Sequence, residues 1–384
     1  MFVPREESFT SHLRSPAVAS RIGIWLGICF GLAIVTGVIS HFAQAHVWWF
    51  PYPTSPSWGY RVTQGVHVIS GTAAVPLLLV KLWTVFPKLF ARVPRSLRAL
   101  SVDAVEKASI GVLVAAAVFQ LVTGLANSAQ WYPWSFSFRS THYAVGWVAI
   151  GALIVHIGVK LPIIRTALGN DIEDSSQDRD STEAESSGLS RRGLLRTTWV
   201  AAGVAVLTTA GATIPVLRKV SVFGVRDGEG PQGVPINKSA EGAGVTTSAV
   251  DPDYALSVIH KGNTRTLTRA DLQALPQRTA SLPIACVEGW SASATWTGVP
   301  VRDLLDLVDA PPDSEVTVTS LQQRGAFRKT LLQGNFTDHP DTLLALQLNG
   351  EELSIDHGYP CRLIAPNRPG VLQTKWVHTM EVTA

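Results

Sequence analysis

Four long apolar stretches fill most of the N-terminal half of the chain, and a fifth, weaker one follows a polar break. Each is about as long as the roughly 20 helical residues that a hydrocarbon core requires. Two or three such helices could be buried in a soluble core, but five with charge-poor centres are typical of a membrane protein. We therefore expect an N-terminal all-α transmembrane four-helix bundle over residues 1–168. Its spans run roughly over 21–42, 61–86, 108–129 and 142–161.

A polar second half follows this apolar half. Only 16% of the residues are charged, against about 25% in a typical soluble chain, and the deficit lies almost entirely before Leu161. The net charge of +3 is too small to indicate a nucleic-acid partner, so we expect membrane lipid and no nucleic acid. The pattern predicts a cytoplasmic linker at 169–197, a fifth transmembrane anchor helix at 198–217, a tether at 218–250 and a soluble domain at 251–384.

Lysine and arginine are distributed unevenly between the connections, and cytoplasmic loops carry an excess of both. The second-to-third connection contains Lys88, Arg92 and Lys107. The fourth-to-fifth connection contains Arg165 and Arg196 among others. The two remaining connections are poor in basic residues and rich in aromatic ones, as at a membrane interface. We therefore expect a cytoplasmic N-terminus, five membrane passes and a C-terminal domain outside the cytoplasm.

An acidic, serine-rich segment at 170–187 precedes the fifth stretch and is typical of a disordered linker. It is followed by Arg191-Arg192, then Leu194-Leu195 and a weakly apolar helix. This order is similar to a twin-arginine export signal placed inside the chain. The alternative is an anchor whose basic residues only keep its start in the cytoplasm. Because the twin-arginine route carries folded proteins, an exported domain would fold around its cofactor before export.

Histidines inside lipid are costly and therefore indicate function. His67 lies in the second span and His156 in the fourth, while His142 opens the fourth and His41 ends the first. His142 and His156 fall within about 40° of one helix face and about 21 Å apart in depth, as two stacked haems with axial histidines would require. Over residues 20–161 this arrangement resembles the four-helix diheme cytochrome b family, which includes the b561 type.

The resemblance implies haem b, as one or two groups. We expect His67 and His142 to pair across an outer haem, with His41 as a competing outer ligand. His156 would be one ligand of an inner haem. The family places the second ligand near the cytoplasmic start of the first helix. The candidate there is His12, which precedes the first span. The alternative is that these histidines form hydrogen bonds between helices or lie at the lipid headgroups.

Short β-type runs alternate with helix-like pieces in the polar half. This mixture predicts an α+β domain with mainly antiparallel pairing. The expected strands are 254–260, 281–286, 315–320, 362–365 and 376–382. The expected helices are 267–275, with Thr268 as the cap, and 301–307.

Two separated motifs stand in this half. The first is Cys286-Val-Glu-Gly-Trp-Ser, followed by Trp296-Thr-Gly-Val-Pro. The second is Asp356-His-Gly-Tyr-Pro-Cys-Arg-Leu-Ile-Ala-Pro, followed by Gly370 and Lys375-Trp-Val. Over residues 254–384 they resemble the sulfite-oxidase superfamily of molybdopterin enzymes, in particular its bacterial periplasmic methionine-sulfoxide-reductase branch. The resemblance implies a sulfite-oxidase-like molybdopterin-binding domain in a bacterium's plasma membrane.

A thiolate suits a soft, high-valent metal, and the resemblance makes Cys286 the molybdenum ligand. Cys361 is the rival thiol, and its simpler interpretation is a small buried hydrophobic residue. A Cys286–Cys361 disulfide is a further alternative in an oxidising compartment.

Polar and aromatic residues beside the motifs are expected to bind the anionic pterin cofactor. The resemblance favours Arg362 and Lys375 for the phosphate, with Trp290, Trp296 and His357 lining the site. The remaining candidates are Asn367, Arg368 and Gly370.

Catalytic roles are expected for Cys286, Glu288 and Trp290. Sulfite oxidases carry an arginine-rich pocket after the ligand cysteine, whereas Glu288 would here repel an anion and Trp290 would form an apolar wall. This argues for a neutral or bulkier oxo substrate, small or protein-bound, although Arg324 and Arg328 could still reach the site.

The favoured hypothesis is a membrane-bound molybdenum oxidoreductase that performs two-electron oxygen-atom transfer and exchanges electrons through b-type haem with a quinone or another carrier. One alternative is a molybdenum enzyme with a haem-free anchor and a soluble electron partner. Another is a non-catalytic binding protein on the same fold. The residues leave the substrate and the reaction direction open.

Overall fold

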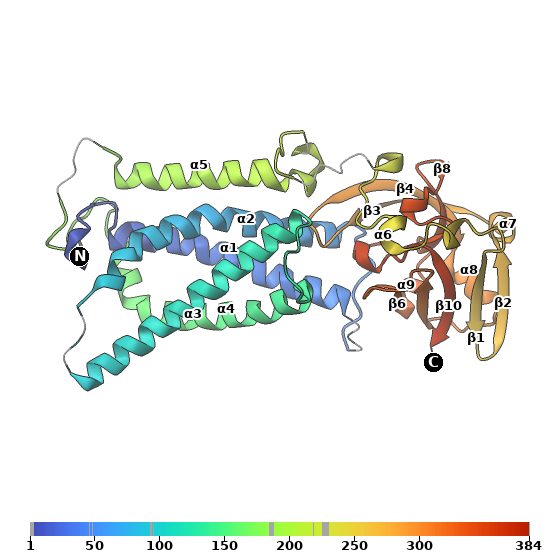
Figure 1. Ribbon diagram of the computed structural model, residues 1–384, viewed down its shortest axis with the longest axis horizontal. Coiled ribbons are helices and arrows are strands. Elements are labelled where there is room, and N and C mark those ends of the chain that lie inside the picture. Colours follow the sequence, from blue (N-terminus) through green and yellow to red (C-terminus); the bar gives the residue numbers. More distant parts are fainter. Residues whose placement is uncertain are drawn as a thin grey trace. The chain divides into compact units, whose positions relative to one another are not determined.

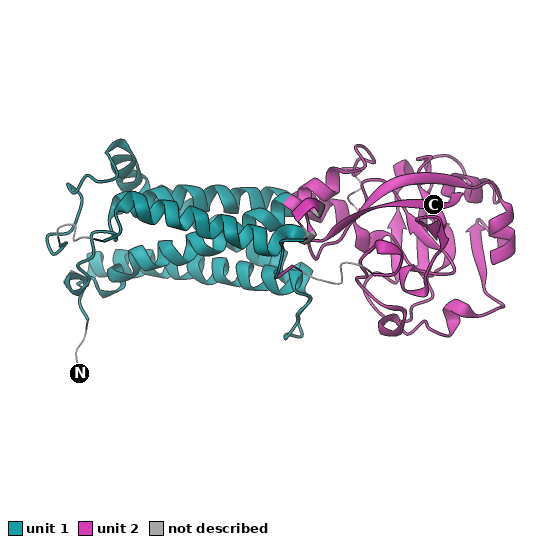
Figure 2. Ribbon diagram, turned by 90° about the horizontal axis from the view of Figure 1, so that it is seen from above, with its two compact units in different colours: residues 1–37, 66–211, 219–222 teal, residues 38–65, 212–218, 223–384 magenta. Residues whose placement is uncertain are grey.

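The computed structural model describes residues 4–383 except 46, 48, 93, 95, 184–187, 218 and 225–229. The chain divides into two compact units, which Figure 2 shows in separate colours. Unit 1 comprises Met1–Gly37, Val66–Gly211 and Lys219–Val222. Unit 2 comprises Val38–Gly65, Ala212–Arg218 and Phe223–Ala384. The ends of two N-terminal helices therefore belong to the same unit as the β-rich half.

The apolar stretches form four long helices (Figure 1). They are α1 (Pro16–Gln44), α2 (Gly59–Val85), α3 (Leu97–Ser128) and α4 (Phe138–Gly169). With the turn that extends α2 to Phe90, all four are long and apolar enough to cross a membrane, and between 6% and 33% of their most apolar windows is buried within the protein. Side chains such as Val35 and Ile154 are exposed, as expected for helices that face lipid. The predicted four-helix region is confirmed.

Partly buried cations tie these helices together within unit 1. The Arg21 guanidinium donates to the carbonyl oxygens of Ala167 (3.0 Å) and Asn170 (2.7 Å). The Lys81 ammonium donates to the Ala19 carbonyl at 2.7 Å. These contacts link α1 to the C-terminal end of α4 and to α2.

The fifth helix, α5, runs over Arg191–Thr209 rather than the predicted 198–217. It begins earlier because the Ser190 hydroxyl accepts from the Gly193 amide at 3.1 Å and caps the first turn. Short 3₁₀ turns at Ala210–Ala212 and Pro215–Leu217 follow it. Unlike α1–α4, α5 is not among the helices that are apolar enough to span a membrane. The fifth pass stays a prediction.

The acidic linker folds into turns over its described residues 170–183, whereas the sequence indicated disorder. Its acidic residues and carbonyls surround the arginine pair. Buried Arg191 forms an ion pair with Asp178 and donates to the carbonyls of Ile172 (3.1 Å) and Asp174 (2.9 Å). Arg192 pairs with Asp171 at 2.9 Å. The remaining linker residues, 184–187, lie outside the described part of the chain.

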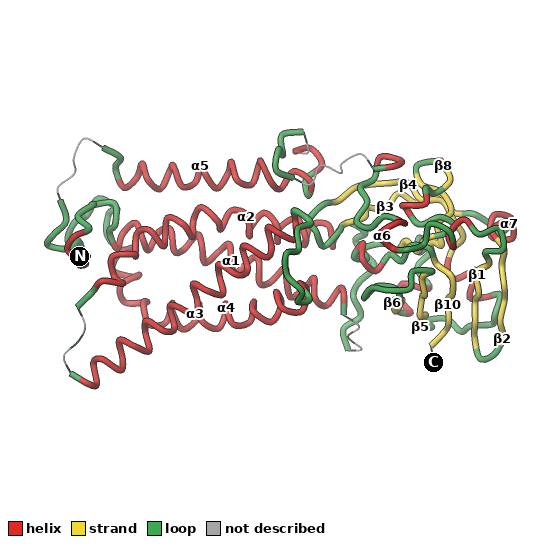
Figure 3. Tube along the Cα trace, viewed as in Figure 1, coloured by secondary structure: helices red, strands yellow, loops and turns green. Residues whose placement is uncertain are grey.

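Unit 2 contains two five-stranded sheets, and its strands are drawn yellow in Figure 3. The first has the order β2-β1-β10-β5-β6. Its members are β1 (Ala255–His260), β2 (Asn263–Thr268), β5 (Glu315–Ser320), β6 (Lys329–Leu332) and β10 (Val377–Thr383). The second has the order β3-β4-β7-β8, with β9 also paired to β7. Its members are β3 (Arg278–Ala285), β4 (Ser291–Pro300), β7 (Leu343–Leu348), β8 (Glu351–Glu352) and β9 (Arg362–Ile364).

Strands β1 and β10 pair in parallel, and the other strand pairs of the two sheets are antiparallel. The predicted α+β class with mainly antiparallel pairing is therefore confirmed. The short helices are α6 (Ala240–Ala243), α7 (Arg269–Ala274), α8 (Val301–Asp306) and α9 (Gly334–Thr337). Thr268 caps α7 as predicted, through its hydroxyl and the Asp271 amide. The predicted helix over 267–275 was too long, because Leu267 pairs with Leu256 at the end of β2.

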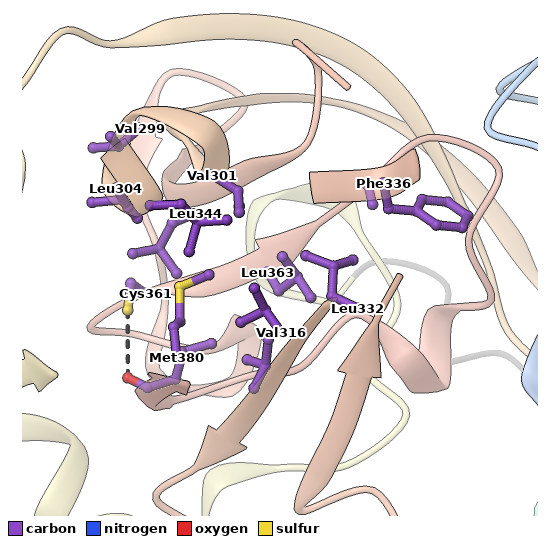
Figure 4. Packing of buried hydrophobic residues seen from close by; sticks show 14 of the residues in the cluster. Val299, Val301, Leu304, Val316, Leu332, Phe336, Leu344, Cys361, Leu363 and Met380 are labelled. Atoms are coloured by element: carbon purple, nitrogen blue, oxygen red, sulfur yellow. Dashed lines mark hydrogen bonds between the residues drawn. The ribbon is translucent and has the colours of Figure 1, made fainter. Parts of the chain in front are cut away.

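The two cysteines of unit 2 lie in different hydrophobic clusters. Cys361 packs with Leu344, Leu363 and Met380 in the larger cluster (Figure 4). Its sulfur lies 3.1 Å from the Tyr254 hydroxyl, and burial raises the pKa of its thiol to about 12. Cys286 belongs to the second cluster, and both cysteines are free. The disulfide alternative was wrong, and Cys361 is the small buried residue of the simpler interpretation.

Candidate active site

Cys286 opens the tight turn that joins β3 to β4. The Cys286 amide donates to the Trp290 carbonyl at 2.9 Å, and the Gly289 amide donates to the Cys286 carbonyl at 3.1 Å. Gly289 has φ +90°, a conformation that favours glycine. The turn therefore fixes a fully buried thiol at the end of a strand.

The side chains of this turn close around the sulfur. The Trp290 indole donates to Oε2 of Glu288 at 3.1 Å, and the Cys286 thiol donates to the same oxygen at 3.5 Å. Burial, and next the Glu288 charge, raise the pKa of the Cys286 thiol well above its usual value. Without a bound metal the thiol keeps its proton, and a metal that binds there must displace it.

Two buried cations stand beside this thiol. Arg362 is 2% exposed and Lys375 is 8% exposed. Burial lowers the pKa of Arg362 to about 9 and that of Lys375 well below its usual value, and Cys286 is an electrostatic neighbour of both. The Lys375 ammonium donates to the carbonyls of Lys238 and Asp356, both at 2.8 Å. Within the described residues, neither cation forms an ion pair with a carboxylate.

His357 adds an unused acceptor to the same cluster. Its Nε2–H donates to the Pro231 carbonyl at 2.7 Å, which leaves a lone pair on Nδ1. That Nδ1 and the Nε of Arg362 are buried without a hydrogen-bond partner in the described structure. Burial, and next the Arg362 charge, lower the pKa of His357 to about 4, so the imidazole is neutral at pH 7.

These groups fit an anionic cofactor that is rich in hydrogen-bonding atoms. Buried charges without a counter-ion are costly, and buried polar atoms usually find partners. Molybdopterin would supply a phosphate for the cations and polar ring atoms for His357 and Arg362. The Arg362 guanidinium lies 5.3 Å from the centre of the buried Trp296 ring, so Trp296 forms a wall for this arginine.

Gly370 also belongs to this region. A Cβ at this position would lie 3.0 Å from the Ala285 carbonyl oxygen, directly before Cys286. The close approach of the two backbones therefore requires a small residue at Gly370.

Asn367 and Arg368, in contrast, form hydrogen bonds to segments other than the Cys286 turn. The Asn367 carboxamide bonds to the Tyr60 amide (2.5 Å) and the Pro53 carbonyl (2.7 Å). The Arg368 guanidinium donates to the Leu331 carbonyl at 2.7 Å. No contact of these two side chains reaches the Cys286 turn in the described part of the chain, so they support the backbone around the site.

The exposed Arg324 and Arg328 lie in the β5–β6 connection. Arg328 donates to the Gln323 carbonyl of the same connection at 3.4 Å. No described contact brings either arginine to Cys286.

Sequence reasoning missed two residues that touch the Cys286 turn. Thr213 bonds to Gly289, and the Gln64 amide donates to the Val287 carbonyl at 3.4 Å. Both residues belong to unit 2 but lie at sequence positions remote from the turn. No local pattern marks them, because an isolated threonine or glutamine carries no motif.

A second candidate centre lies in unit 1. The rings of His67 on α2 and His142 on α4 have centroids 6.3 Å apart and planes at 67°. His67 Nδ1 lies 2.9 Å from the Ala33 carbonyl oxygen, and His142 Nδ1 lies 2.9 Å from the Thr123 hydroxyl. Hydrogen bonds at Nδ1 orient an imidazole and leave Nε2 as the ligand atom. The two side chains therefore suit a haem iron with two histidine ligands.

The other histidines are arranged differently. His41 belongs to unit 2, and its ring contacts the neighbouring Phe42 at 6.2 Å. His156 is partly buried on α4, and no ring contact joins it to another histidine among the described residues. The His12 carbonyl accepts from Arg191 at 3.1 Å. The described structure thus brings together one of the expected histidine pairs.

Residues 243–384 match the family described as oxidoreductase molybdopterin binding domain. This part of the chain is therefore similar to molybdopterin-binding oxidoreductase domains, and it is also similar to sulfite oxidases and methionine-sulfoxide reductases. The protein-methionine-sulfoxide reductase catalytic subunit MsrP of Xanthomonas axonopodis pv. citri is 29% identical over 119 residues, which are 26% of this chain and 37% of that protein. The sulfite oxidase of Arabidopsis thaliana is 26% identical over 155 residues, which are 32% of this chain and 39% of that protein.

A protein of Azospira oryzae, provisionally named protein-methionine-sulfoxide reductase subunit YedZ1, is 32% identical over 124 residues, which are 30% of this chain and 43% of that protein. The crystal structure of the sulfane dehydrogenase SoxCD from Paracoccus pantotrophus is similar at 23% identity and a TM-score of 0.31, over 35% of this chain and 40% of that one. The chain therefore spans less than half the length of each of these proteins.

Proposed function

We propose that this chain is a bacterial membrane-bound oxidoreductase that performs two-electron oxygen-atom transfer outside the cytoplasm. The observation that carries the proposal is the buried Cys286 thiol with two desolvated cations, Arg362 and Lys375, as its electrostatic neighbours. Neither cation forms an ion pair with a carboxylate among the described residues. A non-catalytic binding protein would not need a metal-binding thiol in such a setting.

In this proposal the molybdenum cofactor supplies the oxygen-atom transfer chemistry when bound. Cys286 holds the metal as a thiolate, and Arg362 and Lys375 stabilise that thiolate and the cofactor's negative charge. His357 accepts a hydrogen bond at Nδ1, because its Nε2–H is already committed to Pro231. Trp296 and Gly370 would shape the space for the cofactor. Asn367 and Arg368 would support the backbone around that space.

We infer that a neutral oxo compound, a sulfoxide rather than sulfite, is the substrate class. The Glu288 carboxylate lies next to the metal-binding thiol and would repel an incoming anion. Trp290, held by Glu288, offers an apolar surface to the substituents of a sulfoxide. Two similar proteins are named methionine-sulfoxide reductase catalytic subunits, which agrees with this class.

We further propose that unit 1 exchanges electrons with a quinone or another carrier through b-type haem. His67 and His142 would hold the iron, and their Nδ1 contacts would fix both rings for that role. The contact between the two rings supports one haem at this pair more directly than it supports a second haem at His156 or a ligand role for His41.

The proposed organisation keeps the order predicted from the sequence: a cytochrome b-like bundle at 1–168, a linker, a fifth span, a tether and an exported domain at 251–384. The fifth span is assigned to α5, Arg191–Thr209, in place of the predicted 198–217. The Arg191-Arg192 pair at the start of α5 supports twin-arginine export. Because Arg191 is buried by the acidic linker, the export machinery would have to read the pair before that linker closes over it.

Replacing the proposed metal ligand tests the enzyme assignment. Cys286→Ser in the full-length protein should remove the contact between this side chain and molybdenum, because a serine hydroxyl is a poor ligand for a soft metal. X-ray absorption of the molybdenum in the purified protein measures this as the loss of one sulfur neighbour, with Cys361→Ala as the matched thiol control that should keep all of its sulfur neighbours. Unchanged sulfur coordination in Cys286→Ser would rule out the ligand assignment.

The haem proposal predicts a specific spectral loss. His67→Ala and His142→Ala should each remove the dithionite-reducible b-type absorbance from the purified protein, while His41→Ala should retain it. The same absorbance in His156→Ala would indicate one haem, and half of it would indicate two. If the wild-type protein has molybdenum but no such band, the haem-free anchor replaces this proposal.

The export proposal is tested at the arginine pair. Arg191→Lys with Arg192→Lys keeps both charges but should prevent export, so an external protease should no longer cleave the C-terminal domain in spheroplasts. Arg165→Lys, in the same cytoplasmic connection, is the control that should export normally. Unchanged cleavage in the double variant would favour the plain anchor.

A further inference from the structure

Two segments from outside the family-matched residues hold the turn that carries Cys286. One is the start of α2, and the other is the short segment that follows α5. Both belong to unit 2 together with the turn. The family match begins at residue 243, so neither segment is part of the molybdopterin-binding domain as that family defines it.

Thr213 makes a reciprocal contact with the turn. Its hydroxyl donates to the Gly289 carbonyl, and its own carbonyl accepts from the Ser291 hydroxyl at 3.0 Å. Thr213 is only 5% exposed, so water is a poor substitute for either bond. The two contacts fasten the C-terminal side of the turn to the segment that follows α5.

Gln64 holds the other side of the turn. Its Nε2 donates to the Val287 carbonyl at 3.4 Å, and its side chain is buried. The next residue, Gly65, packs against Thr213, since a Cβ there would lie 3.1 Å from the Thr213 methyl group. The two supports therefore touch each other as well as the turn.

The start of α2 is itself anchored to unit 2. The Tyr60 amide donates to the Asn367 carboxamide at 2.5 Å, and the Tyr60 ring lies in the same buried cluster as Cys361. Asn335 donates to the Tyr52 carbonyl at 2.8 Å. Gln64 thus projects from a fixed helix end, as a positioning group must.

Within the turn, the Cys286 and Gly289 amides form backbone hydrogen bonds, and the Cys286 thiol and Trp290 indole donate to Glu288. Gly289 gives the turn's backbone wide conformational freedom. The hydrogen bonds from Gln64 to the Val287 carbonyl and from Thr213 to the Gly289 carbonyl restrict that freedom before a metal binds.

We propose that Thr213, assisted by Gln64, is a positioning residue that holds the Cys286 turn in its ligand-ready shape. That the shape serves metal binding rests on the proposed function, whereas the hydrogen bonds of Thr213 and Gln64 to the turn do not. Two segments of unit 2 that lie outside the family-matched residues would then help to complete the active site.

The test uses full-length protein produced without the cofactor, with a maleimide as the probe and each cysteine followed by mass spectrometry. Thr213→Val keeps the shape of the side chain and removes the donor. We expect it to raise the labelling rate of Cys286 about tenfold, the effect of losing one buried hydrogen bond. Thr213→Ser restores the donor and should stay within about twofold of wild type.

Cys361 is the internal control, because it is equally buried in the other cluster. An unchanged Cys286 rate in Thr213→Val, or an equal rise at Cys361, would overturn the positioning role. The outcome is separable from the enzyme assignment. If wild-type protein never acquires molybdenum but Thr213→Val still exposes Cys286, the proposed function falls and the positioning contact stands.

Discussion

Arg362 and Lys375 are buried beside a buried thiol, and neither forms an ion pair with a carboxylate in the described part of the chain. The burial of charges is normally avoided or compensated. The carbonyl oxygens of His357 and Lys238 accept hydrogen bonds from Arg362 and Lys375 and compensate their charges only in part. The turn between β3 and β4 carries Cys286, strand β9 carries Arg362, and a 3₁₀ turn carries His357; together they bring these groups to one place. An anionic cofactor would offset the free-energy cost of burying these charges. Its binding would therefore stabilise the fold of unit 2.

Much of this arrangement was predictable from the sequence, because the chemistry is local to two motifs. The order of residues around Cys286 and around Arg362 predicted the candidate site, whose role stays a proposal, and the apolar stretches predicted the four helices that the structure shows. Strands β2 and β4 were not predicted, because β2 is mostly exposed and polar and β4 is built largely from serine, alanine and threonine. Strand β7 is buried on nearly all sides and shows no alternation.

Contacts between remote segments could not be predicted. The direction of the Asn367 and Arg368 side chains depends on the Pro53–Tyr60 segment and on Leu331. Thr213 and Gln64 reach the Cys286 turn only because the chain returns to it from other helices. On α2, Gln64 and His67 are three residues apart, close to one helical turn. The same helix therefore carries a support of the proposed molybdenum site and a ligand of the proposed haem.

We propose that one chain couples oxygen-atom transfer to a haem in its membrane part. This coupling can be measured by reducing the purified wild-type protein with a limiting amount of dithionite, without oxygen, and then adding a methyl aryl sulfoxide. We expect the reduced b-type absorbance to decay while the corresponding sulfide forms, with two electrons consumed per sulfide. A reduced band that persists in the presence of excess sulfoxide, in protein that contains molybdenum, would contradict this coupling.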